Sequence, residues 1–352
     1  MARDHTIPCF YLSRFACELG RRPRLNKVYV YEKSKKPWKS SVESIGYECG
    51  YFRYYLPDGS VTEAFEGRLA DLEDQCNSIL AYSASPIFDL DALSGRVFLS
   101  FYMGMLFARS TSRRKMSVEN WEKLKAPFLE VAQNEEYVRD AAIRFSNKTE
   151  TVVTTDYVRE VMRAQADKFS TKETTSNAFI ANLIDHDNIM VNSLVPRRWQ
   201  IWEAPAEAEF VTSDNPVITF IPIGPNLWHP GYGFNTPNVV AAFPLAPTAC
   251  LVVASDNMLG NPAALQIHEI GDQQHKIVDA STVSRINELV ISCSDRFVYA
   301  KNCDANIEQA VNDIGHTTVP LVNAFLHPFP GARQIEEHLR KTIGIPRQAD
   351  AA

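Results

Sequence analysis

The pattern of apolar residues changes near residue 198, and this change constrains the fold more than any other feature. Between residues 61 and 197, apolar side chains recur at helical spacing, as in the helix predicted from Phe65 to Leu80. From residue 198 onward they form short runs bounded by Pro, Gly and Asn, which is typical of strands. The pattern predicts an α+β fold, in which a helical middle region packs against a mainly antiparallel sheet.

The N-terminal strands are expected to join that sheet together with the C-terminal third. A helix is predicted to begin near Pro8, followed by strands at 27–32 and 47–56. Further helices are predicted at 91–114, 118–144 with a kink or break at Pro127, 156–169, 175–193 and 281–293. We expect one large domain over 1–330, comprising 1–60, 61–197 and 198–302, with a polar tail at 331–352.

Composition excludes several classes of protein. Of the 352 residues, 45% are hydrophobic and 22% are charged, which is typical of a globular chain and not of a disordered one. The seven cysteines contain no CxxC pair, so a disulfide framework or zinc knuckle is not expected and a reducing compartment fits best. The longest apolar run, Val97–Ala108, is too short to cross a bilayer. With no signal sequence visible, we expect a cytoplasmic protein without a membrane partner.

Charge is distributed unevenly along the chain. The formal net charge is −6, yet the first 40 residues contain ten Lys and Arg against three acids. This basic segment suggests an anionic partner, although a solvated basic surface explains it equally well. The pI near 5.8 excludes a protein that is basic throughout, as many nucleic-acid binders are.

Two segments carry motifs that resemble those of a known family. Residues 5–15 read HTIPCFYLSRF and residues 210–217 read FVTSDNPV. The pairs Glu66-x6-Glu73 and Arg109-x3-Arg113 and the sequence Pro244-Leu-Ala-Pro247 fall at matching places. From about residue 3 to about residue 300, the chain resembles the family designated domain of unknown function 4238. Cys9 departs from the pattern, since many members carry Gln there.

The resemblance implies an activity, because some fungal proteins of this family resemble arginine-containing cyclodipeptide synthases. Such enzymes join two amino acids, each delivered by aminoacyl-tRNA, into a diketopiperazine. The resemblance therefore implies an aminoacyltransferase with aminoacyl-tRNA as its partner, an amino-acid or dipeptide product, and no DNA. The ester is already activated, so no metal or nucleotide cofactor is expected.

Ser213, Asp214 and Asn215 form the first group of candidate site residues. Because Pro216 disfavours a helical conformation at Asn215, the three lie in a sharp turn at a strand end. Ser213 would accept the acyl group, while Asp214 would bind an ammonium group or a metal and Asn215 would help to bind substrate. The alternative is a turn whose side chains bond only to local backbone.

His5 is the candidate acid or base. An imidazole with an ordinary pKa near 6.5 is suited to proton transfer around neutral pH. His5 with Ser213 and Asp214 supplies the residue types of a hydrolase triad, but adjacent Ser and Asp and the lack of GxSxG argue against one. The alternative for His5 is a buried ring that anchors the N-terminus.

Glu66 and Glu73 are candidate substrate ligands. They lie two helical turns apart on one face, where they could bind a guanidinium group. The same carboxylates could hold Mg²⁺ in a nuclease, the one case in which a cofactor is expected. A solvated helix face is the third interpretation.

Basic residues are the candidate tRNA contacts. Arg109 and Arg113 share a helix face, so an anion between them would offset their repulsion. Positive charge at a helix C-terminus is the alternative explanation. The full set of expected tRNA contacts is Arg14, Arg21, Arg22, Arg24, Lys27, Arg109, Arg113 and Arg114.

Three functions follow from these residues. The leading hypothesis is the aminoacyl-tRNA-dependent cyclodipeptide synthase. The first alternative is a metal-dependent nuclease or toxin that uses Asp214 with Glu66 or Glu73. The second is a non-enzymatic binding module in which the motif residues are structural.

Overall fold

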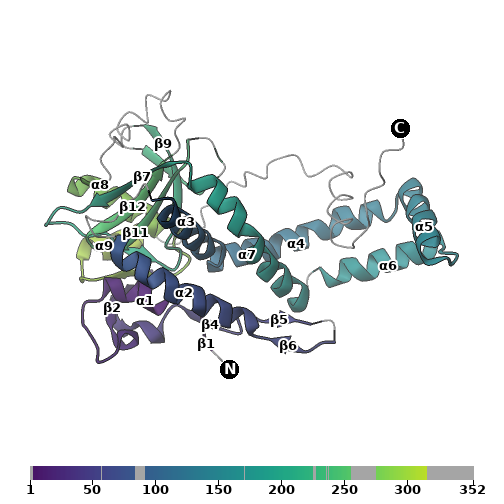
Figure 1. The fold of residues 1–352 in the computed structure, drawn as a ribbon, viewed down its shortest axis with the longest axis horizontal. Coiled ribbons are helices and arrows are strands. Elements are labelled where there is room, and N and C mark those ends of the chain that lie inside the picture. The colour runs from purple at the N-terminus through teal and green to yellow at the C-terminus, as the bar shows by residue number, and fades with distance from the viewer. Residues whose placement is uncertain are drawn as a thin grey trace. The chain divides into compact units, whose positions relative to one another are not determined.

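The computed structural model describes residues 3–56, 58–83, 92–169, 171–224, 227–234, 236, 238–254 and 275–314. These residues form two compact units, coloured along the chain in Figure 1. The larger unit contains the described residues of Met1–Glu119 and Lys172–Leu321, and the smaller contains those of Asn120–Thr171. We describe each unit by itself, and a single domain over 1–330 stays a prediction.

The larger unit contains a six-stranded sheet in the order β10-β9-β11-β12-β7-β13. Neighbouring strands are antiparallel, except that β13 pairs with β7 in parallel. The strands are β7 (Arg198–Glu203), β9 (Ile218–Gly224), β10 (Leu227–Pro230), β11 (Val240–Ala246), β12 (Ala249–Ala254) and β13 (His275–Ile277). The strand-rich region expected after residue 198 is therefore confirmed.

A second sheet joins the two ends of the described chain. Its four strands lie in the order β3-β2-β14-β8, all antiparallel. They are β2 (Lys27–Tyr31), β3 (Trp38–Ser41), β8 (Thr212–Ser213) and β14 (Val298–Ala300). The N-terminal strands thus pair with the C-terminal third as expected, but in a separate sheet. Two short ribbons complete the strands, β1 (Arg3–His5) with β4 (Tyr47–Cys49) and β5 (Tyr54–Tyr55) with β6 (Val61–Thr62).

Helices cover both faces of the six-stranded sheet. They are α1 (Cys9–Leu12), α2 (Ala64–Ser83), α3 (Leu93–Ala108), α7 (Lys172–Leu194), α8 (Ala280–Cys293) and α9 (Ala305–Asp313). Ala241 and Phe243 pack with α1 and α3, whereas Val240 and Ala242 pack with α8 on the opposite face (Figure 1). Because both faces are covered, β11 is apolar throughout instead of alternating with polar residues.

Helix α3 contains the longest apolar run and is almost entirely buried from Leu99 to Ala108. The helix expected over 91–114 ends at this point, because the Ser110 hydroxyl donates to the carbonyl of Phe107 and a new helix starts at Thr111. In the part of the chain that the structure describes, no helix has both the length and the apolar character needed to cross a membrane.

The smaller unit is built from the end of α4 (Thr111–Val131) with α5 (Glu135–Thr149) and α6 (Thr155–Lys168). Phe128, Val138 and Met162 lie in its own apolar core. The expected helix 118–144 is two helices, because Asn134 caps α5 by accepting a hydrogen bond from the Tyr137 amide. Pro127 lies within α4, which continues through it.

Candidate functional site

The motif segments meet at the Tyr11 hydroxyl. This group donates to the carbonyl oxygen of Pro244 at 2.7 Å and lies 2.7 Å from the Thr212 hydroxyl. Since the single Tyr11 hydrogen is directed at Pro244, Thr212 is the donor in the second bond. Nearby, the Arg14 Nε donates to the carbonyl of Leu245 at 2.6 Å. Three of the segments that carry the family resemblance, 5–15, 210–217 and 244–247, are therefore joined by hydrogen bonds of Tyr11 and Arg14.

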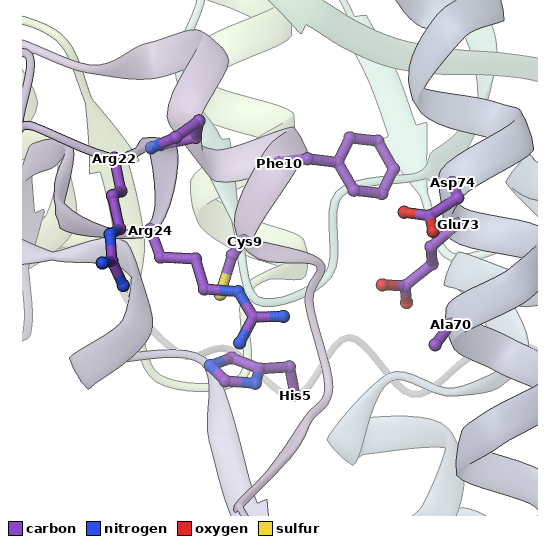
Figure 2. Close-up of a pocket in the computed structure, with 9 residues that line it drawn as sticks. His5, Cys9, Phe10, Arg22, Arg24, Ala70, Glu73 and Asp74 are labelled. Carbon is purple, nitrogen blue, oxygen red and sulfur yellow. The ribbon is translucent and has the colours of Figure 1, made fainter.

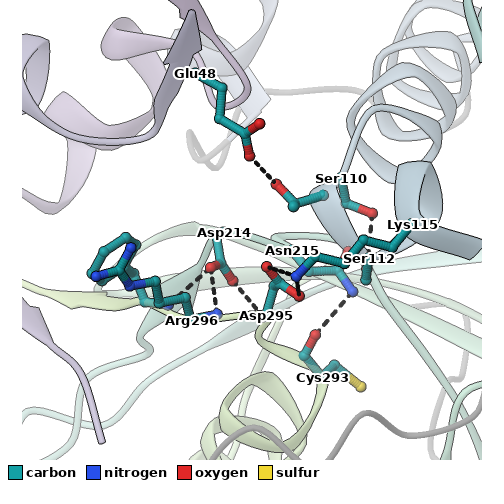
Figure 3. Close-up of polar contacts among 11 residues, drawn as sticks. Glu48, Ser110, Ser112, Lys115, Asp214, Asn215, Cys293, Asp295 and Arg296 are labelled. Carbon is teal, nitrogen blue, oxygen red and sulfur yellow. Dashed lines mark hydrogen bonds and ion pairs between the residues drawn. The ribbon is translucent and has the colours of Figure 1, made fainter. Parts of the chain in front are cut away.

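Asp214 binds the backbone at the start of β14. Its carboxylate oxygens accept hydrogen bonds from the amides of Asp295 at 2.7 Å, Arg296 at 2.6 Å and Phe297 at 2.8 Å (Figure 3). Burial raises the pKa of Asp214 to about 7, while these three donors favour the charged form. The carboxylate thus holds the turn that leads into the second sheet.

Ser213 and Asn215 also bond within the turn. The Ser213 hydroxyl donates to the Asn215 carbonyl at 3.0 Å and accepts from the Asn215 amide at 3.2 Å. The Asn215 side-chain amide donates to the carbonyl of Cys293 at 3.1 Å (Figure 3). This geometry is that of a local polar turn, so the catalytic and substrate-binding roles of Ser213, Asp214 and Asn215 stay predictions.

A cavity of about 590 Å³ lies between the N-terminal segment and α2. It brings together four of the candidates, His5, Arg22, Arg24 and Glu73, while Ser213, Asp214, Asn215 and Glu66 do not line it. The lining residues, most of them labelled in Figure 2, are His5, Cys9, Phe10, Arg22, Pro23, Arg24, Ala70, Glu73 and Asp74.

Opposite charges line the two sides of this cavity. Arg22 and Arg24 come from an exposed turn after α1, and the Arg24 guanidinium extends past Cys9 and His5. Glu73 and Asp74 lie across from it on α2 (Figure 2). A ligand with a negative group at one end and a positive group at the other fits this arrangement.

His5 is held in its neutral form. Burial lowers its pKa, and the cationic side chains of Arg24 and Arg109 act in the same direction. The Glu43 backbone and the Glu73 carboxylate oppose this shift without reversing it. Among the residues described, none bonds to the buried Nε2 of His5. His5 lines the cavity, and a neutral imidazole with one unbonded ring nitrogen is suited to act as a general base.

Cys9 is not an activated thiol, although it lines the same cavity. Burial raises its pKa to about 11, and the thiol lies 3.6 Å from the Val42 carbonyl as a weak donor. The thiolate that would act as nucleophile is therefore scarce at neutral pH.

Arg109 lies behind the acidic wall of the cavity. Its Nη1 donates to Glu73 Oε1 at 2.7 Å, and its side chain is 0% exposed against 21% for Glu73. This placement corrects the expectation of a tRNA contact, because a fully buried guanidinium presents nothing to a phosphate outside the protein. The apolar run that precedes Arg109 was the sequence signal for its burial.

Arg113 and Arg114 also face the protein. The Arg113 guanidinium lies 3.8 Å from the centroid of Phe107, and burial lowers its pKa to about 9. Arg114 donates to the Tyr51 carbonyl at 3.0 Å and lies over the Tyr51 ring. These stacked geometries differ from the phosphate contacts that the sequence suggested.

The basic N-terminal residues divide into two groups. Arg21, Arg22, Arg24 and Lys27 are exposed. Arg14 is half-buried against Leu245, and Lys27 forms an ion pair with Glu18 at 3.1 Å. The exposed group is therefore the part of the expected tRNA surface that is accessible.

Glu66 lies near a second acidic group. Burial raises its pKa, and the neighbouring carboxylates of Asp4, Glu63 and Glu73 add to the shift. Asp4 is buried and accepts a hydrogen bond from the Phe52 amide at 3.1 Å. Over the described ranges, no group of three or more His, Cys, Asp or Glu side chains is arranged to hold a metal ion.

The fold is that of an α+β protein, and the cavity between its N-terminal segment and α2 is lined by side chains of opposite charge. Comparison of the sequence with family models identifies the family. Residues 3–304 match the family described as "Protein of unknown function (DUF4238)", and the chain belongs to it. Searches of curated proteins and of solved structures found no match.

Proposed function

We propose that this protein is an aminoacyltransferase that uses aminoacyl-tRNA and forms an arginine-containing cyclic dipeptide. The observation that supports the proposal is the cavity in which Arg22 and Arg24 face Glu73 and Asp74, with neutral His5 beside them. The 3′ end of an aminoacyl-tRNA carries the same two charges, since its phosphates are anionic and its α-amino group is cationic.

Each wall has a part in the proposed complex. Arg22 and Arg24, together with exposed Arg21, bind backbone phosphates and position the 3′ end. Glu73 and Asp74 bind the cationic groups of the amino acid. Phe10 offers an aromatic surface on which the terminal base or a side chain packs.

The reaction needs an amine, an ester and a base. The α-amino group of one aminoacyl ester attacks the carbonyl carbon of the other. A C–N bond forms, the C–O bond to the ribose breaks, and the ribose hydroxyl leaves. The ammonium group first loses one proton to solvent and attacks as the neutral amine. His5 takes the second proton from the amine nitrogen as the C–N bond forms and gives it to the leaving ribose oxygen. The same exchange within the dipeptidyl ester closes the ring and releases the second tRNA.

Product analysis tests the proposal. The full chain is expressed in bacteria, and the culture is compared by LC–MS with an empty-vector culture for masses of cyclo(Arg-Xaa). We expect a new diketopiperazine that H5Q abolishes. A purified, folded protein that yields no diketopiperazine from any mixture of aminoacyl-tRNAs contradicts the proposal.

A non-enzymatic binding module is the second candidate. It is favoured by the internal hydrogen bonds of Tyr11, Ser213 and Asp214, because these bonds assign the motif residues a structural role. This candidate predicts that H5Q changes no product while Y11F and D214N lower the melting temperature. No contact described above favours the nuclease.

A further inference from the structure

Behind the cavity wall, two buried side chains, Arg109 and Tyr102, carry polar atoms that lack hydrogen-bond partners among the described residues. Arg109 Nε and Nη2 and the Tyr102 hydroxyl have no hydrogen-bond partner among the residues that the structure describes. Both side chains are 0% exposed. Buried polar groups are rarely left unpaired, because each one loses its hydration without replacement. An acceptor for these groups must come from outside the described residues.

The unpaired nitrogens of Arg109 have a particular geometry. Glu73 occupies only Nη1, so the edge formed by Nε and Nη2 remains complete. This edge donates two parallel hydrogen bonds and is the part of a guanidinium that binds a carbonyl or carboxylate oxygen best.

The fold brings the two side chains to the same place. Positions 102 and 109 are seven residues apart at the end of α3, so they share one face. Tyr102 packs against Phe10 with 6.0 Å between ring centroids, and Arg109 binds Glu73. Phe10 and Glu73 both line the cavity. The hydroxyl of Tyr102 is also within electrostatic reach of Arg109 and Glu73, although burial has the largest effect on its pKa, which is raised.

We infer that Arg109, Tyr102 and Glu73 form a subsite for the backbone of an α-amino acid. Glu73 binds the ammonium group, and the Nε–Nη2 edge of Arg109 with the Tyr102 hydroxyl donates to the carbonyl oxygen. In an α-amino acid only two carbon atoms separate the ammonium nitrogen from the carbonyl oxygen. Their binding groups must therefore be neighbours, as the Glu73 carboxylate and the Arg109 guanidinium are. The ligand reaches the subsite between Phe10 and Glu73.

This inference deepens the proposed function and rests on it for the identity of the ligand. It assigns recognition to the atoms that all aminoacyl groups share, instead of to an arginine side chain. In the transferase, the same donors lie where negative charge develops on the carbonyl oxygen during attack.

Matched ligands test the subsite in the full-length protein. Arginine amide and agmatine differ only in the carboxamide, as do leucine amide and isoamylamine. Affinities are measured by calorimetry. We expect at least one amide to bind about fivefold to tenfold more tightly than its matching amine, as one or two added hydrogen bonds imply. Equal affinity within both pairs, or no binding by either amide, overturns the inference.

Variants identify the donors. Y102F removes an unpaired hydroxyl and R109K replaces the two-donor edge with a point charge, so both should remove most of the preference for the amide. Y11F is the matched control, because Tyr11 is an equally buried tyrosine whose hydroxyl is bonded to Thr212 and Pro244. It should keep the preference. If Y102F and R109K both retain the wild-type preference, the donors are misassigned and the inference fails.

The two proposals fail in different ways. A protein that prefers amides but makes no diketopiperazine retains the subsite and loses the transferase function. A protein that makes diketopiperazine without any preference for amides retains the transferase function and loses the subsite.

Discussion

The Tyr11 hydroxyl lies 2.7 Å from Thr212 Oγ1, although 201 positions separate the two residues in the chain. With the Pro244 carbonyl, also at 2.7 Å, they form a buried polar junction between α1, β8 and β11. Residues from three segments that resemble the family's motifs are thus partners of one another. These motif residues therefore connect segments of the fold, and the contacts alone assign them no chemical role.

The first prediction concerns this junction. Y11F removes a donor that serves Pro244 and leaves Thr212 without its buried partner, so the free energy of unfolding should fall by about 1–3 kcal/mol. Urea denaturation measures the change. Y102F should cost much less, because its hydroxyl has no partner in the described residues to lose. Equal losses in the two variants would contradict the assignment.

The second prediction concerns Asp214. An Asn there keeps one acceptor oxygen but turns an amide donor toward backbone N–H groups, so D214N should lower the free energy of unfolding by roughly 2–3 kcal/mol. S213A should cost less, since it leaves only local turn bonds unmade. Thermal and urea unfolding give both values. A D214N protein as stable as wild type yet without product would instead support a catalytic role for Asp214.

The third prediction concerns the ion pair of Arg109 and Glu73. R109Q leaves a partly buried carboxylate unpaired, which should cost about 2–4 kcal/mol, with solvent at Glu73 limiting the loss. The double variant R109Q/E73Q removes both charges and should recover much of that stability. A double-mutant cycle in urea measures the coupling. Additive losses would mean that the two side chains do not interact.

The fourth prediction is a pH dependence from His5. Because the folded protein lowers the pKa of His5, the unfolded chain binds more protons between that lowered pKa and about 6.5. His5 therefore makes stability rise with pH across this window and contributes no further change above it. Because His5 stays neutral to a pH below 6.5, product formation should continue to a pH below 6.5 as well. Comparing H5Q with wild type between pH 5 and 8 isolates both effects. An acid limb centred above 6.5 would exclude His5 as the base.

The fifth prediction concerns RNA. Combining R22A with R24A should weaken tRNA binding and reduce the slope of log affinity against log salt by about 0.7 for each lost phosphate contact. Arg163, which is exposed on α6 in the smaller unit, provides the control R163A. Filter binding across a salt series measures the slope. If the R22A/R24A variant shows the same slope as R163A and the wild type, Arg22 and Arg24 do not contact RNA.

The sequence predicted the classes of secondary structure well, because they depend on local periodicity. It placed the helix from Phe65 and the buried run before Arg109 correctly. It did not separate α3 from α4 or α4 from α5, since those breaks depend on hydrogen bonds of Ser110 and Asn134 that look like ordinary polar residues.

The candidate site was harder to predict from the sequence than the secondary structure. Which charges face a cavity is decided by packing between segments far apart in the chain. His5 and Glu73 lie on the same cavity, whereas Asp214 accepts three backbone hydrogen bonds from residues 295–297, just before β14. Nothing local in the sequence marks Tyr102 as part of a polar group.

The pairing of β2 with β14 has a consequence for biosynthesis. Tyr31 lies opposite Val298, so the second sheet cannot close until nearly 300 residues have left the ribosome. Folding that depends on such distant contacts is slow, because a long loop must be closed before the contact forms. Strand β2 is therefore synthesised long before its partner β14, and through most of translation it remains unpaired with that strand.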